Sequence, residues 1–435
     1  MSQSAAGTAG AQGTRAPATG LRRTMEQVAG DGRRDARRRR SVARHQTGFW
    51  LIAATFTLTM AFSTVPTPLY PLYQQADGFG PFVVTIVFAT YAVGVLAALF
   101  LAGHLSDWLG RRTVLLPAVA LSIASAMVFA SRYSVPALIV ARLLSGLSVG
   151  LLTATATAHL DDLHRRARPH ASSVRANVVA TGANLGGLGI GPLVSGLLAE
   201  RAPAPLRTPY LIFLGLLALA AVAVLLVPET VARPEPRPRY RPQRVSVPDG
   251  ARPAFFAAAG AGLVTFAVLG LFTSLTPLVL GGLHVASPTV TGLAAFLVFG
   301  SAALAQILLA RVGTRTQLQA GLGLLAVGMA VVAAAVWTAD LPLFLVGGAV
   351  SGAGGGTAFK GCVSTVLSLA VPERRGETLT GLFLAAYLGL SVPVLGLGLA
   401  VQAVPVRDAV LGFAGLVVAA AILLMRRFAR SSLSG

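Results

Sequence analysis

The sequence GHLSDWLGRR, residues 103–112, connects two long apolar segments, 81–103 and 113–131. The Gly at its start and the Gly near its end permit close helix approach and a tight turn. Its acidic residue is an anion at a helix end, where it can pair with an Arg or meet a helix N-terminus. Such a contact can hold packed helices in one arrangement and must break in another. We therefore expect a conformational latch made of Gly103, Asp107, Gly110, Arg111 and Arg112.

Apolar segments of bilayer-spanning length recur on both sides of this stretch. A membrane-spanning helix needs about 20 apolar residues. The composition agrees, because 54% of the 435 residues are hydrophobic and only 11% are charged, which leaves too little polar surface for a soluble protein. We predict an all-α integral membrane protein with spans at about 47–70, 81–103, 113–131, 135–160, 173–199, 208–227, 253–281, 288–310, 315–338, 341–370, 377–402 and 406–425.

The distribution of arginine predicts the orientation. If the N-terminus is inside, 29 Arg lie in the tails and inner connections and four lie outside, with Arg142 left within a span. Cytoplasmic loops carry the excess of basic residues, so we expect both termini in the cytoplasm and the protein in the cell membrane. Residues 1–46 form a basic tail without apolar periodicity, predicted to be disordered. That tail either attracts anionic lipids or is a dispensable extension.

The helical region repeats once. Thr67-Pro68-Leu69 recurs as Thr276-Pro277-Leu278, and three other short matches recur in the same order at nearly the same offset. The region 228–252 between the repeats is rich in Pro and Arg, which favours an extended linker. We therefore expect six-helix bundles at 47–227 and 253–427, related by pseudo-symmetry, with a short tail at 428–435. A substrate site between two such halves is typical of alternating-access transporters.

Small residues at helical spacing occur in the fourth and fifth spans. The segment GLGIGPLVSG, residues 187–196, has Gly every four residues and a Pro that bends the helix. This pattern is either a specific motif or generic small-residue packing, because Gly is abundant in this chain. The positions expected to pack helices closely are Gly146, Gly150, Gly187, Gly191, Pro192 and Gly196.

Three of these motifs resemble one family. The stretch 103–112 is similar to the signature loop of the major facilitator superfamily, RLLSG at 142–146 resembles its fourth-helix motif, and 187–196 resembles the motif of its drug–proton antiporter branch. The resemblance extends over about 47–430. It implies the fold of that superfamily and a transporter whose latch stabilises the state closed to the cytoplasm.

Arg142 lies about seven residues below the outer end of its span, about 10 Å deep. A charge at that depth costs free energy unless it faces a cavity or a partner, so it is a functional candidate. In the antiporters that the chain resembles, the matching Arg is thought to assist coupling. The alternative is a structural Arg that donates to carbonyl groups of a neighbouring helix.

Other polar residues within spans are candidates for binding. Asn177, Thr181 and Asn184 share one face of the fifth span, and we expect them to line a cavity. Lys360, the only lysine, either extends to the headgroups or contacts an anionic substrate group. Tyr387 is a further candidate.

Several other functions are excluded or disfavoured. Gly146-Leu-Ser148-Val-Gly150 matches a hydrolase motif without a base to serve it, and Gly354 to Lys360 lacks the Gly-Lys-Ser/Thr of a phosphate loop. The single Cys362 allows no disulfide framework and no cysteine-based zinc site. We expect no enzyme, no metal and no cofactor, and a proton gradient as the driving force.

The sequence favours a proton-coupled exporter of hydrophobic or amphipathic small molecules. The alternatives are uptake of a small organic anion, suggested by the two intramembrane cations, and a membrane sensor that transports nothing. We expect the partners to be a small-molecule substrate and the lipid bilayer, with no nucleic acid, and the protein to be a monomer. Substrate identity and the proton-carrying residue are not predicted.

Overall fold

The computed structural model describes residues 42–103, 105–231, 240, 242–247 and 250–430, which form helices and loops without a strand. Twelve helical segments of this described part are long and apolar enough to cross a membrane. This confirms the predicted fold class. The expected tail up to residue 41 and part of the linker lie outside the described residues.

The first half holds six spans, which begin with a helix at 42–64. The other elements of this half are η1 (Thr67–Leu69), α2 (Tyr70–Asp77), α3 (Pro81–Ala102), α4 (Ser106–Leu109), α5 (Arg111–Ser131), α6 (Val135–Ala167), α7 (Val174–Thr181), the π-helical turn η2 (Gly182–Gly186), α8 (Gly187–Arg201) and α9 (Thr208–Leu226).

The second half holds the other six spans. Its elements are α10 (Arg252–Gly270), the π-helical turn η3 (Leu271–Leu275), α11 (Thr276–Gly282), α12 (Pro288–Leu308), α13 (Thr314–Thr338), α14 (Leu341–Leu369), η4 (Pro372–Arg374), α15 (Arg375–Ala403) and α16 (Val406–Arg430).

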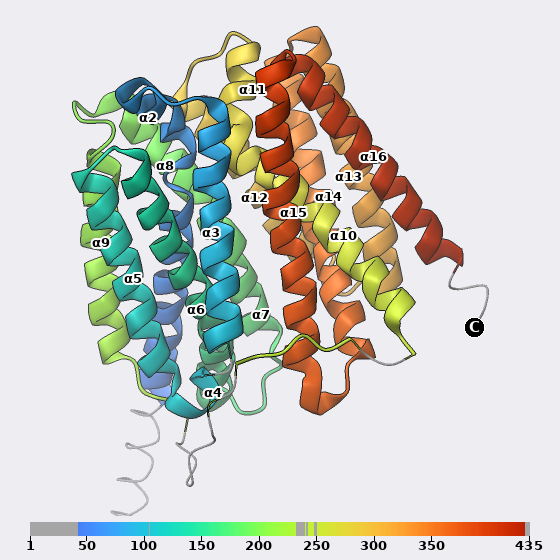
Figure 1. Cartoon of the computed structure of the whole chain (residues 1–435). Coiled ribbons are helices and arrows are strands. Elements are labelled where there is room, and N and C mark those ends of the chain that lie inside the picture. The colour runs from blue at the N-terminus through green and yellow to red at the C-terminus, as the bar shows by residue number, and fades with distance from the viewer. Residues whose placement is uncertain (1–41, 104, 232–239, 241, 248–249, 431–435) are drawn as a thin grey trace, which may run out of the picture.

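The two halves lie side by side (Figure 1), the first coloured blue to green and the second yellow to red. They meet where α8 packs against α12 and α3 packs against α15. Because the spans alternate in direction, residues 42 and 430 share one end of the molecule with residues 227–231 and 250–251, and we call this the terminal end. The opposite end, with the connections 78–80, 202–207 and 404–405, is called the far end.

The repeated Thr-Pro-Leu motif interrupts the first span of each half. Thr67 begins η1 after the helix at 42–64 ends, and Thr276 begins α11 directly after η3. Pro lacks the N–H that a continuous helix needs, so a new helical piece starts at this place in both halves. The two interruptions meet, because the Thr67 hydroxyl donates to the Thr273 carbonyl across the halves at 2.9 Å.

Several helices extend beyond the predicted spans at the terminal end. The first helix begins by residue 42 rather than 47, α6 continues to Ala167 rather than about 160, and α16 continues to Arg430 rather than about 425. The added residues are mostly polar or basic. A helix can continue past the hydrocarbon region, since its backbone groups bond one another wherever the side chains lie.

Candidate functional site

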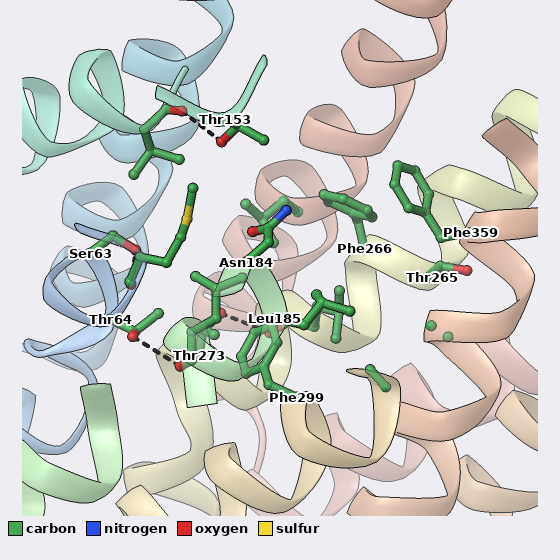
Figure 2. Close-up of a pocket in the computed structure, with 18 of the residues that line it drawn as sticks. Ser63, Thr64, Thr153, Asn184, Leu185, Thr265, Phe266, Thr273, Phe299 and Phe359 are labelled. Carbon is green, nitrogen blue, oxygen red and sulfur yellow. Dashed lines mark hydrogen bonds between the residues drawn. The ribbon is translucent and has the colours of Figure 1, made fainter. Parts of the chain in front are cut away.

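A cavity of about 420 Å³ lies between the two halves. Figure 2 shows Ser63, Thr64 and Thr153 on one side of it, Phe266 and Phe359 on the other, and Asn184 between them. The lining is mostly apolar and aromatic, and none of the described residues that line it is an Asp or a Glu. A pocket of this size and character fits a small organic molecule.

All six predicted coupling and binding candidates line this cavity. They come from four spans, two in each half, which sequence spacing alone does not bring together. These residues are Arg142, Asn177, Thr181, Asn184, Lys360 and Tyr387.

Arg142 is held by its own half of the protein. Its Nε and Nη2 donate to the Tyr70 hydroxyl at 3.0 and 2.5 Å, and its Nη1 donates to the Ser63 carbonyl at 2.7 Å. The guanidinium also lies within 6 Å of the ring centroids of Tyr70, Phe88 and Tyr91. Although the side chain borders the cavity, only 1% of the residue is exposed. These neutral partners and rings compensate a charge that forms no ion pair with a carboxylate of the described chain.

Lys360 borders the cavity from α14 of the other half. Its Nζ donates to the Gln306 carbonyl near the C-terminal end of α12 at 2.8 Å. Lys360 therefore lies at the cavity, as contact with an anionic substrate group would require.

The polar face of the fifth span lies along the cavity and contains the π-helical turn η2. Asn177 is exposed, whereas Thr181 and Asn184 are half-buried, so the face runs from solvent at the terminal end into the molecule. Single π turns inside α-helices occur frequently at functional sites. Here the turn lies where the polar side chains border the cavity.

The small residues of the predicted packing motifs lie at close helix contacts. Gly146 and Gly150 contact α3, and Gly187 and Gly191 contact the first helix. A Cβ added at Gly191 would lie 2.0 Å from the Ala61 carbonyl oxygen, and one at Gly196 would lie 2.3 Å from that of Pro288 in the other half. Any larger residue at these two positions would push the helices apart.

A carboxylate bridges the halves at the far end. Glu200, near the end of α8, accepts hydrogen bonds from the Ser287 hydroxyl and from the N–H and hydroxyl of Thr289, at 3.1 and 2.6 Å for the latter two. These donors lie at the start of α12, where an anion is favourable. With the close contact at Gly196, they join α8 and α12 at the far end. The cavity-lining residues Thr67 and Arg142 toward the far end are buried, whereas Thr157 and Asn177 toward the terminal end are exposed, so the cavity is open toward the terminal end.

The predicted latch forms an ion-pair network at the terminal end. Arg111 contacts Asp107 at 2.6 Å and Asp162 of α6 at 3.2 Å, and it donates to the Ser106 hydroxyl at 2.8 Å. Arg111 is mostly buried, whereas 66% of the Asp107 side chain is exposed. Of the latch residues, Arg111 therefore joins Asp107 to α6, and all of these contacts are within the first half.

Glu229, just after α9, fixes the start of α5 beside this network. Its carboxylate accepts from the N–H groups of Arg111 and Arg112 at 2.9 and 3.0 Å. Burial raises the pKa of Glu229, but these and two further backbone hydrogen bonds outweigh burial and lower it overall, so the group is ionised at neutral pH. Gly110 precedes α5 with a φ of 106°, a conformation that L-residues with a Cβ rarely adopt.

Sequence reasoning missed part of the cavity wall. Thr153 and Thr157 lie one turn apart on α6, and Gln306 lies near the end of α12. The rings of Phe266 and Phe383 also border the cavity. The threonine spacing on the same helix as Arg142 is a signal that could have identified the first two.

Among known protein families, the family model described as Major Facilitator Superfamily matches residues 51–392 of the chain. Curated proteins give no match to the chain.

Three solved structures are similar to the whole helical region. The human organic anion transporter MFSD10 (TETRAN) is 18% identical, with a TM-score of 0.63, over 87% of this chain and 99% of that one. A point mutant of the nucleoside transporter NupG is 15% identical, with a TM-score of 0.68, over 88% and 100%. A POT family transporter in complex with 5-aminolevulinic acid is 10% identical, with a TM-score of 0.70, over 87% and 95%. At these identities the likeness establishes the fold.

Proposed function

The chain belongs to the Major Facilitator Superfamily, and we propose that it is a secondary transporter that exports amphipathic small molecules in exchange for protons. Membership makes it a multi-pass membrane protein of a transporter family. Substrate class, direction and coupling are the proposal.

The observation that carries the proposal is the cavity between the halves. It is lined from both halves, is closed toward the far end, where Glu200 and Gly196 join α8 and α12, and is open toward the terminal end. Alternating access requires a site that is accessible from one end of the protein while the other end is closed. It also requires that the two halves rock about this site. Aromatic and apolar walls with a few polar groups favour an amphipathic substrate.

Export and proton coupling are supported by the motifs of the fourth and fifth spans, which resemble those of drug–proton antiporters. Arg142 is the candidate for coupling. It lies at the cavity without an acidic partner in the described chain, so its hydrogen bonds can respond to a change in protonation or occupancy nearby.

Uptake of a small organic anion is the second candidate function. Lys360 and Arg142 border the cavity and no carboxylate of the described residues does, so the lining is positive overall. One similar structure is an organic anion transporter, a property of that protein.

Transport by the purified protein in proteoliposomes tests both functions. We expect a pH gradient to drive movement of amphipathic compounds against their concentration gradient, and counterflow to proceed without it. Movement of anions in the direction of the proton gradient would favour uptake instead. A broad compound panel that shows neither counterflow nor gradient-driven transport would contradict the proposal.

We further propose that the terminal end faces the cytoplasm. The cluster Arg165, Arg166, Arg168 and the pair Arg426, Arg427 lie at this end, which follows the positive-inside rule. Reporter fusions at residue 240 and at the C-terminus should therefore both report a cytoplasmic position. Fusions that both report an external position would reverse the orientation.

Replacement of Glu200 by Ala should shift the protein away from the terminal-open state. The change removes the acceptor for three hydrogen bonds between α8 and α12. A loss of about 1 kcal/mol alters a two-state ratio by about fivefold. A cysteine placed at Thr157, in the open part of the cavity, should then be modified more slowly by a water-soluble thiol reagent, by up to about fivefold, because the rate follows the open fraction. The native Cys362 is buried and should not contribute to the signal.

Asp340→Ala is the matched control. Asp340 also accepts from a helix N-terminus, the Leu343 N–H at 2.8 Å, but within the second half. Its loss should leave the modification rate unchanged. Equal modification rates with and without the Glu200→Ala change would show that this bridge does not hold the far end closed.

A further inference from the structure

Two cations line the cavity, and their burial and enclosure distinguish them. All three guanidinium nitrogens of Arg142 donate within the protein, to Tyr70 or Ser63, through three of its five N–H groups, and only 1% of the residue is exposed. Its charge is enclosed by aromatic rings of its own half. An incoming anion would have to displace these partners before it could contact the guanidinium.

Lys360 is in the opposite situation. An ammonium group has three donors, and the Gln306 carbonyl accepts one of them. Lys360 is half-buried, borders the cavity, and forms no ion pair with a carboxylate of the described chain. It is therefore the cation that is available to a ligand.

Aromatic rings from three helices line the same cavity as this ammonium. The ring of Phe266 on α10 lies 4.8 Å from that of Phe359 on α14 and 5.6 Å from that of Tyr387 on α15, centroid to centroid. Phe359 also lies 6.0 Å from Phe383. The interplanar angles of 54°, 68° and 59° are far from parallel, so the cluster offers both ring faces and ring edges. Such a surface favours a planar aromatic guest.

A polar group of the cavity wall is left for a ligand. Gly355 and Gly356 border the cavity one turn before Phe359 and Lys360, where α14 packs closely against Thr265 and Ala302. The Thr265 hydroxyl is buried at the cavity wall without a hydrogen-bond partner. A buried hydroxyl without a partner is costly, and a polar substituent of a ligand would satisfy it.

We propose that the transported substrate is an aromatic carboxylate, whose anionic group pairs with Lys360 and whose ring packs among Phe266, Phe359, Phe383 and Tyr387. This inference rests on the proposed function, since it assumes that the cavity is the substrate site. It assigns the charge recognition to the second half and leaves Arg142 to act through Tyr70 and Ser63. A single available cation favours a monoanion over a dianion.

Binding of three isosteric naphthalene derivatives to the full-length protein in nanodiscs tests the inference. The probes are 2-naphthoate, the neutral 2-naphthamide and the cationic 2-naphthylmethylamine. We expect 2-naphthoate to bind about tenfold or more tightly than 2-naphthamide, and the amine to bind most weakly. Equal affinities for naphthoate and naphthamide would overturn the proposal on the unmodified protein alone.

Variants then locate the charge that is responsible. Lys360→Gln should abolish the preference for naphthoate while the affinity for naphthamide stays within about twofold, and Lys360→Arg should retain the preference. Phe266→Ala should weaken binding of both compounds. Arg311→Gln, which removes an exposed cation away from the cavity, is the matched control and should change neither affinity. A preference that survives Lys360→Gln would overturn the assignment to this residue.

The two proposals can fail separately. Naphthoate preference is measured without any gradient, so Lys360-dependent binding without counterflow of any compound would refute the proposed function and keep the anion site. Counterflow of neutral compounds by a protein that shows no Lys360-dependent preference would keep the transporter and refute the anion site. If Lys360→Gln does not fold, two measurements still test the anion site. The first is the preference of the unchanged protein among the three probes. The second is Lys360→Arg, in which loss of the preference for naphthoate would count against a role of the charge.

Discussion

Arg142→Leu should reduce gradient-driven transport by about a hundredfold, a change that corresponds to about 2.7 kcal/mol. Leucine removes both donations to Tyr70 and the donation to Ser63, and it removes the charge from the cavity wall. Hydrogen bonds from a charged group are each worth about 1.5–3 kcal/mol when buried. The amount of membrane-inserted protein should change little, because an intramembrane charge itself costs about 2.5–3.5 kcal/mol on insertion scales.

The readouts separate a coupling role from a structural one. Counterflow without a pH gradient should persist in Arg142→Leu while gradient-driven transport is lost. Arg142→Lys should restore only part of the transport, since an ammonium lacks the planar fork that reaches both Tyr70 and Ser63. Tyr70→Phe should move transport in the same direction with a smaller amplitude.

Arg207→Leu is the control for this series. Arg207 also donates to a tyrosine hydroxyl, that of Tyr133 at 2.7 Å, and lies over the same ring, but at the far end and outside the cavity. Its loss should leave transport unchanged. Full gradient-driven activity in Arg142→Leu would show that Arg142 has a structural role only and no role in coupling.

The architecture was predictable because the bilayer restricts it so strongly. A chain in hydrocarbon must satisfy its backbone internally, so apolar length alone predicts twelve helices. The same cost explains why the intramembrane polar residues could be placed. Arg142, Asn184 and Lys360 have few tolerable positions other than a cavity or a partner, and the structure has all three at the cavity.

The rest of the site depends on tertiary contacts that leave no local signal. A phenylalanine in an apolar span is equally compatible with lipid, core and cavity, so the cluster around Phe266 could not be predicted. Glu200 at the end of a helix is typical of an ordinary exposed acid until Ser287 and Thr289 are known to lie opposite. The pairing of Arg111 with Asp162 joins residues 51 positions apart, which spacing cannot indicate.

Gln243 of the linker separates the latch from the start of α15. It donates its N–H to the Phe100 carbonyl at the end of α3. Its side chain lies between Gly103 and Gly376, where added Cβ atoms would lie 2.6 and 2.8 Å from it. If the terminal end closes as the proposed alternating access requires, we expect α4 and α15 to approach each other.

Asp107→Asn should reduce transport by about tenfold or more while the level of inserted protein stays near that of the unmodified chain. In this structure the Asp107 carboxylate is mostly exposed, and among the described residues it pairs with Arg111 alone, four residues away. Such surface pairs contribute about 0–1 kcal/mol to stability. Folding therefore depends little on this charge. When the terminal end closes, an anion on α4 can meet Arg374 of η4 and Arg375 at the N-terminus of α15. A state-dependent contact of about 1–3 kcal/mol changes a ratio by about 5–150-fold.

Asp408→Asn provides the matched comparison. Asp408 is also an exposed acid paired with a neighbouring Arg, but it lies at the far end of the second half. Its replacement should not affect transport. In Asp107→Asn, a cysteine at Thr157 should be modified at least as fast as in the unmodified chain, because the loss falls on the closed state. Normal transport by a well-inserted Asp107→Asn protein would remove this residue from the gating mechanism and leave closure of the terminal end to contacts between α4 and α15 that do not involve its charge.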